Sequence, residues 1–305
     1  FTFYRTKQEN KCWNFNEKRS GVLKNEYIKS PLNYVGGKYK LLQQIIPLFP
    51  EDINNFIDLF GGGFNVGINV KANRIIYNDM ITQLVDLMKY LKEHTLEESL
   101  QEIDTYIEKY NLSKTNQEGF NQLREYYNKE NRSPIALYTI ISHAFNYQIR
   151  FNQKGEYNMP FGKDRSYFSQ TLRDKFIEFV NELHDKNIVF RNQDFKVIDF
   201  SKLKENDFLY CDPPYLNTTA TYNENGGWGR EEEDALLNLL KDLDNRNIKW
   251  ALSNNVSINT ELKVWAEESG YNINYLNHTY NNSNYHKKDK DIKDLEVLIT
   301  NYKLN

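Results

Sequence analysis

Short apolar runs recur along this chain, each bounded by polar or turn-forming residues. Such runs are typical of buried strands, and they lie at residues 55–60, 74–77, 188–191, 208–211 and 248–252. A short helix is predicted over 39–49 and a longer one over 231–243, between the last two runs. Strands that alternate with helices predict an α/β sheet.

The middle of the chain has a different pattern. From Gln83 to about Glu130, and again over 135–147 and 172–183, apolar residues recur at the spacing of amphipathic helices. Residues 150–163 contain Asn-Gln-Lys-Gly-Glu between extended segments, which predicts a β-hairpin or a long loop. We therefore expect a helical insertion into the sheet. Near the end of the chain, 271–276 and 296–302 predict a closing antiparallel pair of strands.

A glycine-rich turn follows the first predicted strand. Asp58 precedes the turn that contains Gly61 and Gly62, a helix is expected over 66–70, and Asp79 follows about 20 residues after Asp58. Glycines let a backbone approach a ligand closely, but a carboxylate at Asp58 would repel a pyrophosphate. It would pair with the α-amino group of S-adenosylmethionine, while Asp79 would accept hydrogen bonds from ribose hydroxyls. Taken alone, the turn fits a ligand site and a tight structural turn equally well.

The segment Asp212-Pro213-Pro214-Tyr215 directly follows the predicted strand at 208–211. A carboxylate and a proline carbonyl can together accept both hydrogens of an exocyclic amine, and a tyrosine ring can stack on the heterocycle that carries it. Such a pocket suits attack by nitrogen on an electrophile. The alternative is a proline-rich turn that closes a strand. Neither cysteine is placed to form a covalent intermediate with a substrate, so we expect the nitrogen to attack the electrophile directly.

Composition narrows the class of protein. The net charge of −3 argues against a protein that coats nucleic acid indiscriminately, and no apolar run approaches the length of a membrane span, which predicts a soluble protein. Cys12 and Cys211 are far apart and the five histidines are scattered, so neither a disulfide framework nor a metal site is expected. Residues 1–19 do not resemble a signal peptide, and we expect a cytoplasmic location.

Together these motifs resemble those of the Dam-type DNA adenine N6-methyltransferases (alpha-group, D12 class), over roughly residues 31–302. In detail, the motifs are similar to those of the methylases of type II restriction-modification systems. Asn33 stands where the family usually has lysine, and Phe64 replaces the last glycine of the cofactor turn. On this resemblance the cofactor-binding residues are Tyr34, Gly36, Gly37, Lys38, Asp58, Phe60, Gly61, Gly62, Asp79, Asp194, Phe195 and Asp212.

The resemblance also implies a domain organisation. Residues 31–84 and 176–305 would form a Rossmann-like S-adenosylmethionine-dependent methyltransferase sheet, preceded by an N-terminal extension over 1–30. A mainly helical target-recognition insertion over 85–175 would carry the hairpin. The basic run at 286–290 is interpreted as a mobile loop.

The hairpin segment resembles the one with which this family reads DNA. Arg150 can fork onto guanine, Asn152 and Asn158 can pair with adenine, and Lys154 can bind phosphate. For the last three, a solvated hairpin side chain is an equally good interpretation.

The resemblance implies a site-specific methyltransferase that acts on the N6 amine of a flipped adenine in double-stranded DNA. We expect it to need no metal ion and not to associate with a membrane. A separate restriction endonuclease would be its partner in protecting host DNA. The alternative substrates are cytosine N4 and adenine in RNA, because a methyltransferase for either would hold the exocyclic amine in the same way. A nicotinamide-dependent oxidoreductase fits poorly because a spaced third glycine is missing, and a catalytically silent DNA-binding module would not need residues 212–215.

Overall fold

The computed structural model describes residues 27–216, 227–277 and 295–303. Almost all of the expected N-terminal extension (1–30), and the basic run at 286–290, lie outside these ranges. Within them the chain forms one seven-stranded sheet in the order β3-β2-β1-β4-β5-β7-β6. The predicted α/β class is confirmed, and among the described helices none combines the length and apolar character that crossing a bilayer requires.

The first five strands in chain order are parallel and correspond to the predicted apolar runs. Their bounds are β1 (Asn55–Asp58), β2 (Arg74–Asn78), β3 (Ile188–Arg191), β4 (Phe208–Cys211) and β5 (Lys249–Asn255). The predicted closing pair, β6 (Asn272–Tyr275) and β7 (Glu296–Thr300), is also found. Its order in the sheet was not predicted: β7 inserts antiparallel between β5 and β6.

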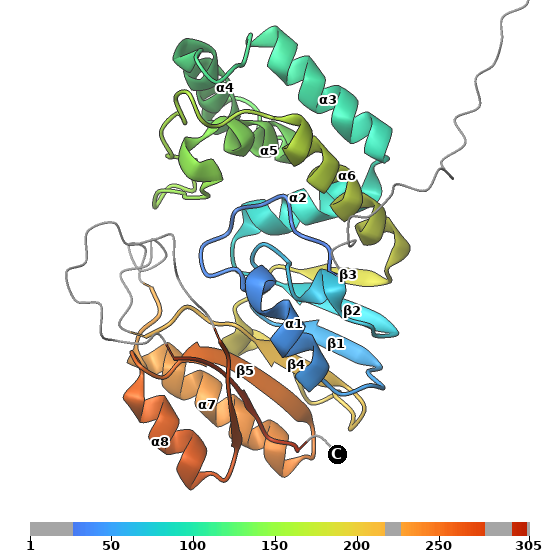
Figure 1. Ribbon diagram of the computed structural model, residues 1–305, viewed down its shortest axis with the longest axis vertical. Coiled ribbons are helices and arrows are strands. Elements are labelled where there is room, and N and C mark those ends of the chain that lie inside the picture. Colours follow the sequence, from blue (N-terminus) through green and yellow to red (C-terminus); the bar gives the residue numbers. More distant parts are fainter. Residues whose placement is uncertain (1–26, 217–226, 278–294, 304–305) are drawn as a thin grey trace, which may run out of the picture.

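Helices cover both faces of the sheet because strand side chains alternate between the two faces. On one face α7 (Arg230–Asn245) and α8 (Thr260–Glu268) pack against Ile57, Leu209 and Trp250. On the other face α1 (Leu42–Ile45) and α2 (Thr82–Glu93) share a core with Phe56, Tyr77 and Phe208. Figure 1 shows α7 and α8 at the end of the molecule farthest from α3 and α4.

The helical middle of the chain forms a separate layer above the sheet in Figure 1. It consists of α3 (Leu96–Lys109), α4 (Gln117–Lys129), α5 (Pro134–His143) and α6 (Gln170–Asp185). Serine, threonine or asparagine side chains cap the first turn of each of these helices, at Thr95, Asn116, Ser133 and Ser169. Almost every residue of α5 is buried, which makes it the centre of the layer.

This layer is not packed independently of the sheet. One continuous hydrophobic cluster contains Phe56 and Tyr210 of the strands together with Ile103, Phe120 and Phe176 of the helices. The boundaries predicted at 84/85 and 175/176 fall inside α2 and α6, so no end of secondary structure marks them. The division into a catalytic domain and an insertion therefore stays a prediction.

The Lys92 side chain of α2 binds the carboxyl end of α6. The ammonium of Lys92 donates to the carbonyls of Leu183, His184 and Lys186 at 2.8–2.9 Å, which satisfies acceptors that a helix end leaves open. The Lys186 ammonium donates in turn to the carbonyl of Val70. These contacts join the helical layer to the sheet through polar groups as well as through the shared core.

Two predicted helices are wrong in part. The helix expected over 66–70 is a single 3₁₀ turn (Gly67–Asn69), because glycine and β-branched residues form helices poorly and the Asn69 side chain bonds to nearby carbonyls. The helix expected over 135–147 ends at His143, since Asn146 and Tyr147 adopt positive φ. Helix α8 was not predicted at all.

Candidate active site

Three carboxylates lie at one edge of the sheet, as the motif positions predicted. Parallel strands β1, β2 and β4 are neighbours, so their carboxyl ends meet there. Asp58 ends β1, Asp79 follows β2 and Asp212 follows β4. They are close enough for Asp79 and Asp212 to raise the pKa of Asp58 by charge repulsion, in addition to the effect of burial.

Asp212 forms a buried ion pair that was not predicted. The Lys38 ammonium lies 2.7 Å from Asp212 Oδ1, and the lysine side chain is only 4% exposed. Lys38 also donates to the carbonyl of Gly36. Burial raises the pKa of Asp212 to about 6, although Lys38 holds it down. The pair commits Oδ1 to lysine and leaves the other carboxylate oxygen free of that contact.

Tyr215 is held by two groups. Its hydroxyl donates a hydrogen bond of 2.9 Å to Glu296 Oε2, at the start of β7, and the Lys38 ammonium lies 5.1 Å from its ring centroid. The pKa of Tyr215 is well above its usual value because of burial and the nearby carboxylates Asp212 and Glu296. The sequence offered no signal for Glu296, which is far away along the chain.

Asp58 and Asp79 are buried carboxylates with few protein partners. Asp58 accepts one hydrogen bond, from the backbone of Gly67, and burial raises its pKa to about 8. Asp79 accepts from the backbone of Gly62 and Ile81, and burial raises its pKa as well. No lysine, arginine or histidine in the described part of the chain forms an ion pair with either.

The raised pKa of Asp58 has an energetic consequence. The folded protein holds its proton more tightly than the unfolded chain does, so stability falls as pH rises from about 4, the usual aspartate pKa, to about 8. A cationic ligand group beside Asp58 would offset this cost. The arrangement therefore fits the α-amino group of S-adenosylmethionine, and Asp79 retains acceptor capacity for hydroxyls.

The glycine turn is also packed by two tyrosines. A Cβ on Gly61 would lie 2.3 Å from the Tyr77 ring, and one on Gly62, whose φ is +47°, would lie 2.7 Å from the Tyr34 ring. The Tyr77 hydroxyl donates to the carbonyl of Gly62. The turn thus needs glycine for its own packing, and it places Tyr34 directly over the backbone. Gly36 and Gly37 lie in the exposed loop that leads from Tyr34 to Lys38.

Phe60 and Phe195 pack together, with ring centroids 5.5 Å apart, and Trp228 contacts both at 5.4 and 5.7 Å. The sequence did not point to Trp228. Its indole donates to the buried carboxylate of Glu233. Trp228 also lines a cavity of about 470 Å³ together with Leu216, the residue that follows Tyr215. Asp194, the neighbour of Phe195, accepts a hydrogen bond from the backbone of Lys196.

The predicted hairpin is present as an isolated bridge between Phe151 and Tyr157. Arg150 donates to Asn158 Oδ1 at 2.8 Å and to the Asn158 carbonyl, so these two predicted DNA contacts bind each other. The amide of Asn152 is similarly bonded to Glu156, and its oxygen accepts from the backbone of Lys154. Lys154 itself is exposed.

The helical layer holds the hairpin in place. Asn128 exchanges two hydrogen bonds with the backbone of Tyr157, while Arg124 donates to the carbonyl of Met159. Gln83 of α2 and Arg132 both donate to the carbonyl of Gly155 at the turn. The hairpin is consequently a rigid projection from α2 and α4.

Asn33, the departure from the family's lysine, connects the two parts of the site. Its amide donates a 2.7 Å hydrogen bond to the carbonyl of Asn146, which lies between α5 and the hairpin. Asn146 and Tyr147 both have positive φ, a strained backbone for residues with side chains. The loop before Lys38 therefore contacts the segment that leads into the hairpin.

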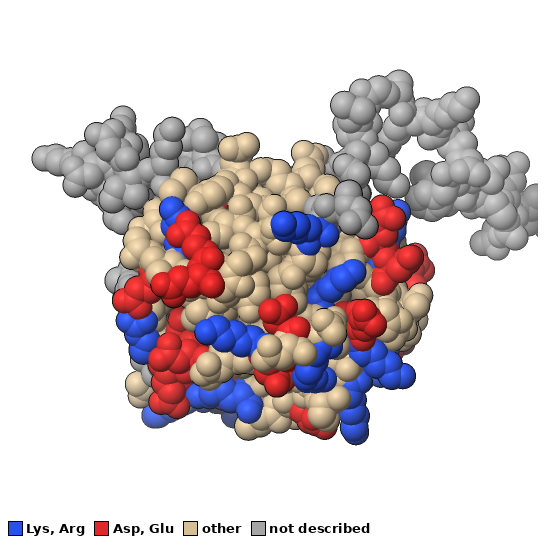
Figure 2. Space-filling view, turned by 90° about the horizontal axis from the view of Figure 1, so that it is seen from below, with Lys and Arg blue, Asp and Glu red and all other residues tan. Residues whose placement is uncertain are grey.

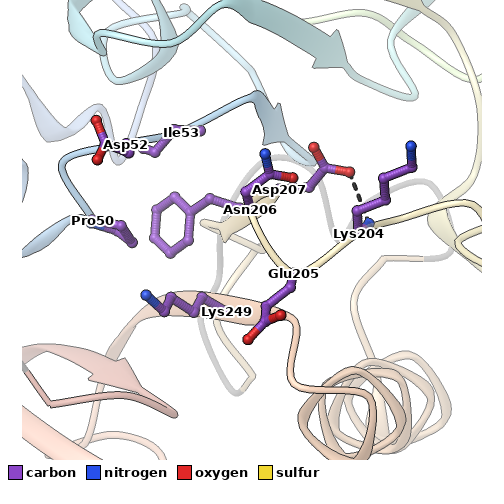
Figure 3. A pocket seen from close by; sticks show the side chains of 9 residues that line it. Pro50, Asp52, Ile53, Lys204, Glu205, Asn206, Asp207 and Lys249 are labelled. Carbon is purple, nitrogen blue, oxygen red and sulfur yellow. Dashed lines mark hydrogen bonds between the residues drawn. The ribbon is translucent and has the colours of Figure 1, made fainter.

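A second cavity lies away from these groups. It has a volume of about 440 Å³ and is lined by Phe208, Lys249, Lys204 and Asp52, at the amino ends of β4 and β5 (Figure 3). This is the sheet edge opposite to Asp212. The buried carboxylate here, Asp207, is satisfied by Asn54, Asn55 and the backbone of Lys204, so it has a structural role. We find no clustered metal ligands in the described ranges.

The mostly parallel sheet, with the segment Asp212–Tyr215 at its carboxyl edge, is consistent with the fold of an S-adenosylmethionine-dependent methyltransferase. The chain belongs to the D12 class N6 adenine-specific DNA methyltransferase family, whose model matches residues 34–294.

Named relatives agree with this family. The type II methyltransferase M.FokI of Planomicrobium okeanokoites is 49% identical over 91% of this chain, and the modification methylase StsI of Streptococcus sanguinis is 46% identical over 91%. The chain spans only 43% of the length of each. The DNA adenine methylase of Escherichia coli K12 is 26% identical over 79% of this chain and 85% of its own length.

The contact between Gly62 and Tyr34 gives a test of the glycine turn. We expect Gly62→Ala to push Tyr34 aside and to weaken S-adenosylmethionine binding about tenfold or more, measured by calorimetry. The matched control is Gly270→Ala, which has a φ of +73° with no atom within 4 Å of the added Cβ. Both changes should cost about 1 kcal/mol of stability from the backbone alone. Wild-type affinity in Gly62→Ala would contradict a role of Tyr34 in the cofactor site.

Proposed function

We propose that this chain is a site-specific DNA adenine N6-methyltransferase that modifies a flipped adenine in double-stranded DNA. The observation that carries the proposal is the unsubstituted segment Asp212–Tyr215 at the same sheet edge as the unpaired carboxylates Asp58 and Asp79. Membership of the family supports it. The names of the relatives favour a role in restriction-modification, with a separate nuclease as partner, in the prokaryotic cytoplasm.

The proposed cofactor site uses the glycine turn and its carboxylates. S-adenosylmethionine, when bound, supplies a methyl group on a sulfonium and leaves as S-adenosylhomocysteine. Asp58 would neutralise the amino-acid end, and Asp79 would accept from the ribose. Tyr34 and the pair Phe60–Phe195 would cover the flat surfaces.

The proposed base site uses the catalytic tetrapeptide. The free oxygen of Asp212 and the carbonyl of Pro213 would accept the two N6 hydrogens, which directs the nitrogen lone pair toward the methyl group. The negative charge of Asp212 stabilises the positive charge that develops on nitrogen. As the N6–carbon bond forms, N6 releases one proton, and Asp212, with a pKa near 6, is placed to accept it. Tyr215 offers the stacking surface for the flipped base.

DNA would approach from the side of the hairpin and the sheet edge. Figure 2 shows the end of the molecule farthest from α3 and α4. Lysine and arginine are interspersed there with acidic residues, and no extended basic surface is seen. We therefore do not expect DNA to bind to this face. The hairpin, with Arg150, Asn152, Lys154 and Asn158, is held by Gln83 of α2 and by Arg132, on the side of the helical layer and away from this face.

The first experiment measures methyl transfer from labelled S-adenosylmethionine to a panel of unmethylated duplexes, followed by mapping of the modified base. We expect N6-methyladenine in one short motif and a loss of about 10² to 10³ in rate for Asp212→Ala, because a preorganised acceptor is removed. The matched control is Asp207→Ala, which removes a buried carboxylate at the opposite edge. Modified cytosine, or transfer to RNA alone, would favour the alternative substrates, and no transfer to any nucleic acid would refute the proposal.

The ion pair predicts the pH dependence. Only ionised Asp212 accepts both a lysine and an amine hydrogen, so the single-turnover rate should rise with pH through about 6 and then level. Lys38→Met removes the charge that lowers this pKa, and the rise should move up by about 1–3 pH units. Lys40→Met, at an exposed position two residues on, should leave the profile unchanged. A profile insensitive to Lys38→Met at saturating cofactor would show that Asp212 does not control the rate.

The hairpin contacts predict two kinds of defect. Lys154→Ala should weaken binding to all duplexes and reduce the salt slope of log Kd by about 1, as for a phosphate contact. Arg150→Ala should relax specificity at one base pair by about 1–3 kcal/mol, as for a base contact. Lys241→Ala on α7 is the control for a lost surface charge. If Arg150→Ala changes affinity equally for all sequences, Arg150 supports the hairpin and does not read a base.

A further inference from the structure

Glu296 is a buried carboxylate that the proposed chemistry does not use. It is 1% exposed and begins β7, the antiparallel strand that the sequence did not place. Burying a carboxylate costs several kcal/mol unless it is paired or hydrogen-bonded. The Tyr215 hydroxyl supplies this buried carboxyl group with a hydrogen-bond donor, at 2.9 Å, from the segment Asp212–Tyr215.

The backbone around Glu296 is fixed by its neighbours in the sheet. Glu296 lies opposite Asn255 of β5, and its carbonyl accepts from the backbone of Leu276 at 2.8 Å. The backbone of Val256 donates to Leu295, just before the strand. Since β5 also pairs with β4, which leads directly into Asp212, the carboxylate is set in register with the tetrapeptide.

The ring of Tyr215 is thus held at its far end by Glu296 and approached by the Lys38 ammonium. Lys38 is itself paired with Asp212. Rotation of the ring would break the bond to Glu296 and leave a buried hydroxyl and a buried carboxylate with one partner fewer. The hydroxyl is otherwise unnecessary for stacking, because a phenyl ring offers the same flat surface.

We propose that Glu296 is a positioning residue for methyl transfer: it holds the Tyr215 hydroxyl and so orients the ring on which the target adenine stacks. This role rests on the function proposed above. Its chemistry requires only an acceptor oxygen at this position. It therefore predicts that an uncharged acceptor preserves the role and that loss of either partner removes it.

The experiment is a double-mutant cycle on the 305-residue chain, read as the single-turnover rate at saturating cofactor and DNA. Tyr215→Phe and Glu296→Ala should each lower the rate about tenfold, the effect of one hydrogen bond to a charged group. The double variant should be no slower than the slower single variant, because both changes remove the same interaction. Glu296→Gln should stay within about threefold of wild type, since its amide oxygen still accepts from tyrosine.

Controls separate positioning from folding. Tyr271→Phe removes another tyrosine–carboxylate bond, to Asp244, on the β6 side of the sheet, and should not change the rate. Cofactor affinity should match wild type in the nearly isosteric variants Tyr215→Phe and Glu296→Gln, and thermal melting should show that both remain fully folded at the assay temperature. With 2-aminopurine at the target position, Tyr215→Phe and Glu296→Ala should increase the emission of the flipped base, because a poorly oriented ring quenches it less.

Several outcomes would overturn the role. A wild-type rate in Glu296→Ala, or single effects that multiply in the double variant, would show that the two side chains act separately. A Glu296→Gln rate as low as that of Glu296→Ala would show that charge, not the hydrogen bond, matters. A wild-type chain that transfers no methyl group would instead refute the proposed function itself.

Discussion

The buried ion pair between Lys38 and Asp212 is the interaction on which the arrangement of the site depends. It joins the loop before the first helix to the end of the central strand β4, and the lysine is almost fully buried. Removing one partner of a buried ion pair lowers the free energy of unfolding by about 3–5 kcal/mol, so substitution of either residue should destabilise the fold. The same ammonium lies near the Tyr215 ring and donates to the carbonyl of Gly36, which links the loop, the carboxylate and the tyrosine ring.

Around this pair the carboxyl edge of the sheet gathers acidic side chains. Asp58, Asp79 and Asp212 are all poorly exposed, and among the described residues Lys38 is the one lysine that pairs with any of them. The protein therefore carries a cost in its folded state that a cationic ligand would reduce. A sulfonium with an α-amino group is such a ligand. The raised pKa values of Asp58 and Asp212 are the signs of this cost.

The helical layer is continuous with the sheet that carries the candidate site. It shares its hydrophobic cluster with the sheet, Lys92 and Lys186 bind carbonyls across the junction, and the hairpin is held by α2 and α4. Asn33 adds a direct contact between the loop before Lys38 and the segment before the hairpin.

The sequence by itself determined the class of fold and predicted which acidic residues meet at one edge of the sheet. Apolar runs and helical spacing are local signals, and Asp58, Asp79 and Asp212 follow strands whose parallel order brings their ends together. The tertiary structure decided what local patterns do not encode. The pairing of Lys38 with Asp212, the contact of Trp228 with Phe60 and Phe195, and the bond from Tyr215 to Glu296 join residues that are distant along the chain. The last of these depends on β7 entering between β5 and β6, because strand order is set by global packing and not by the pattern of any one strand.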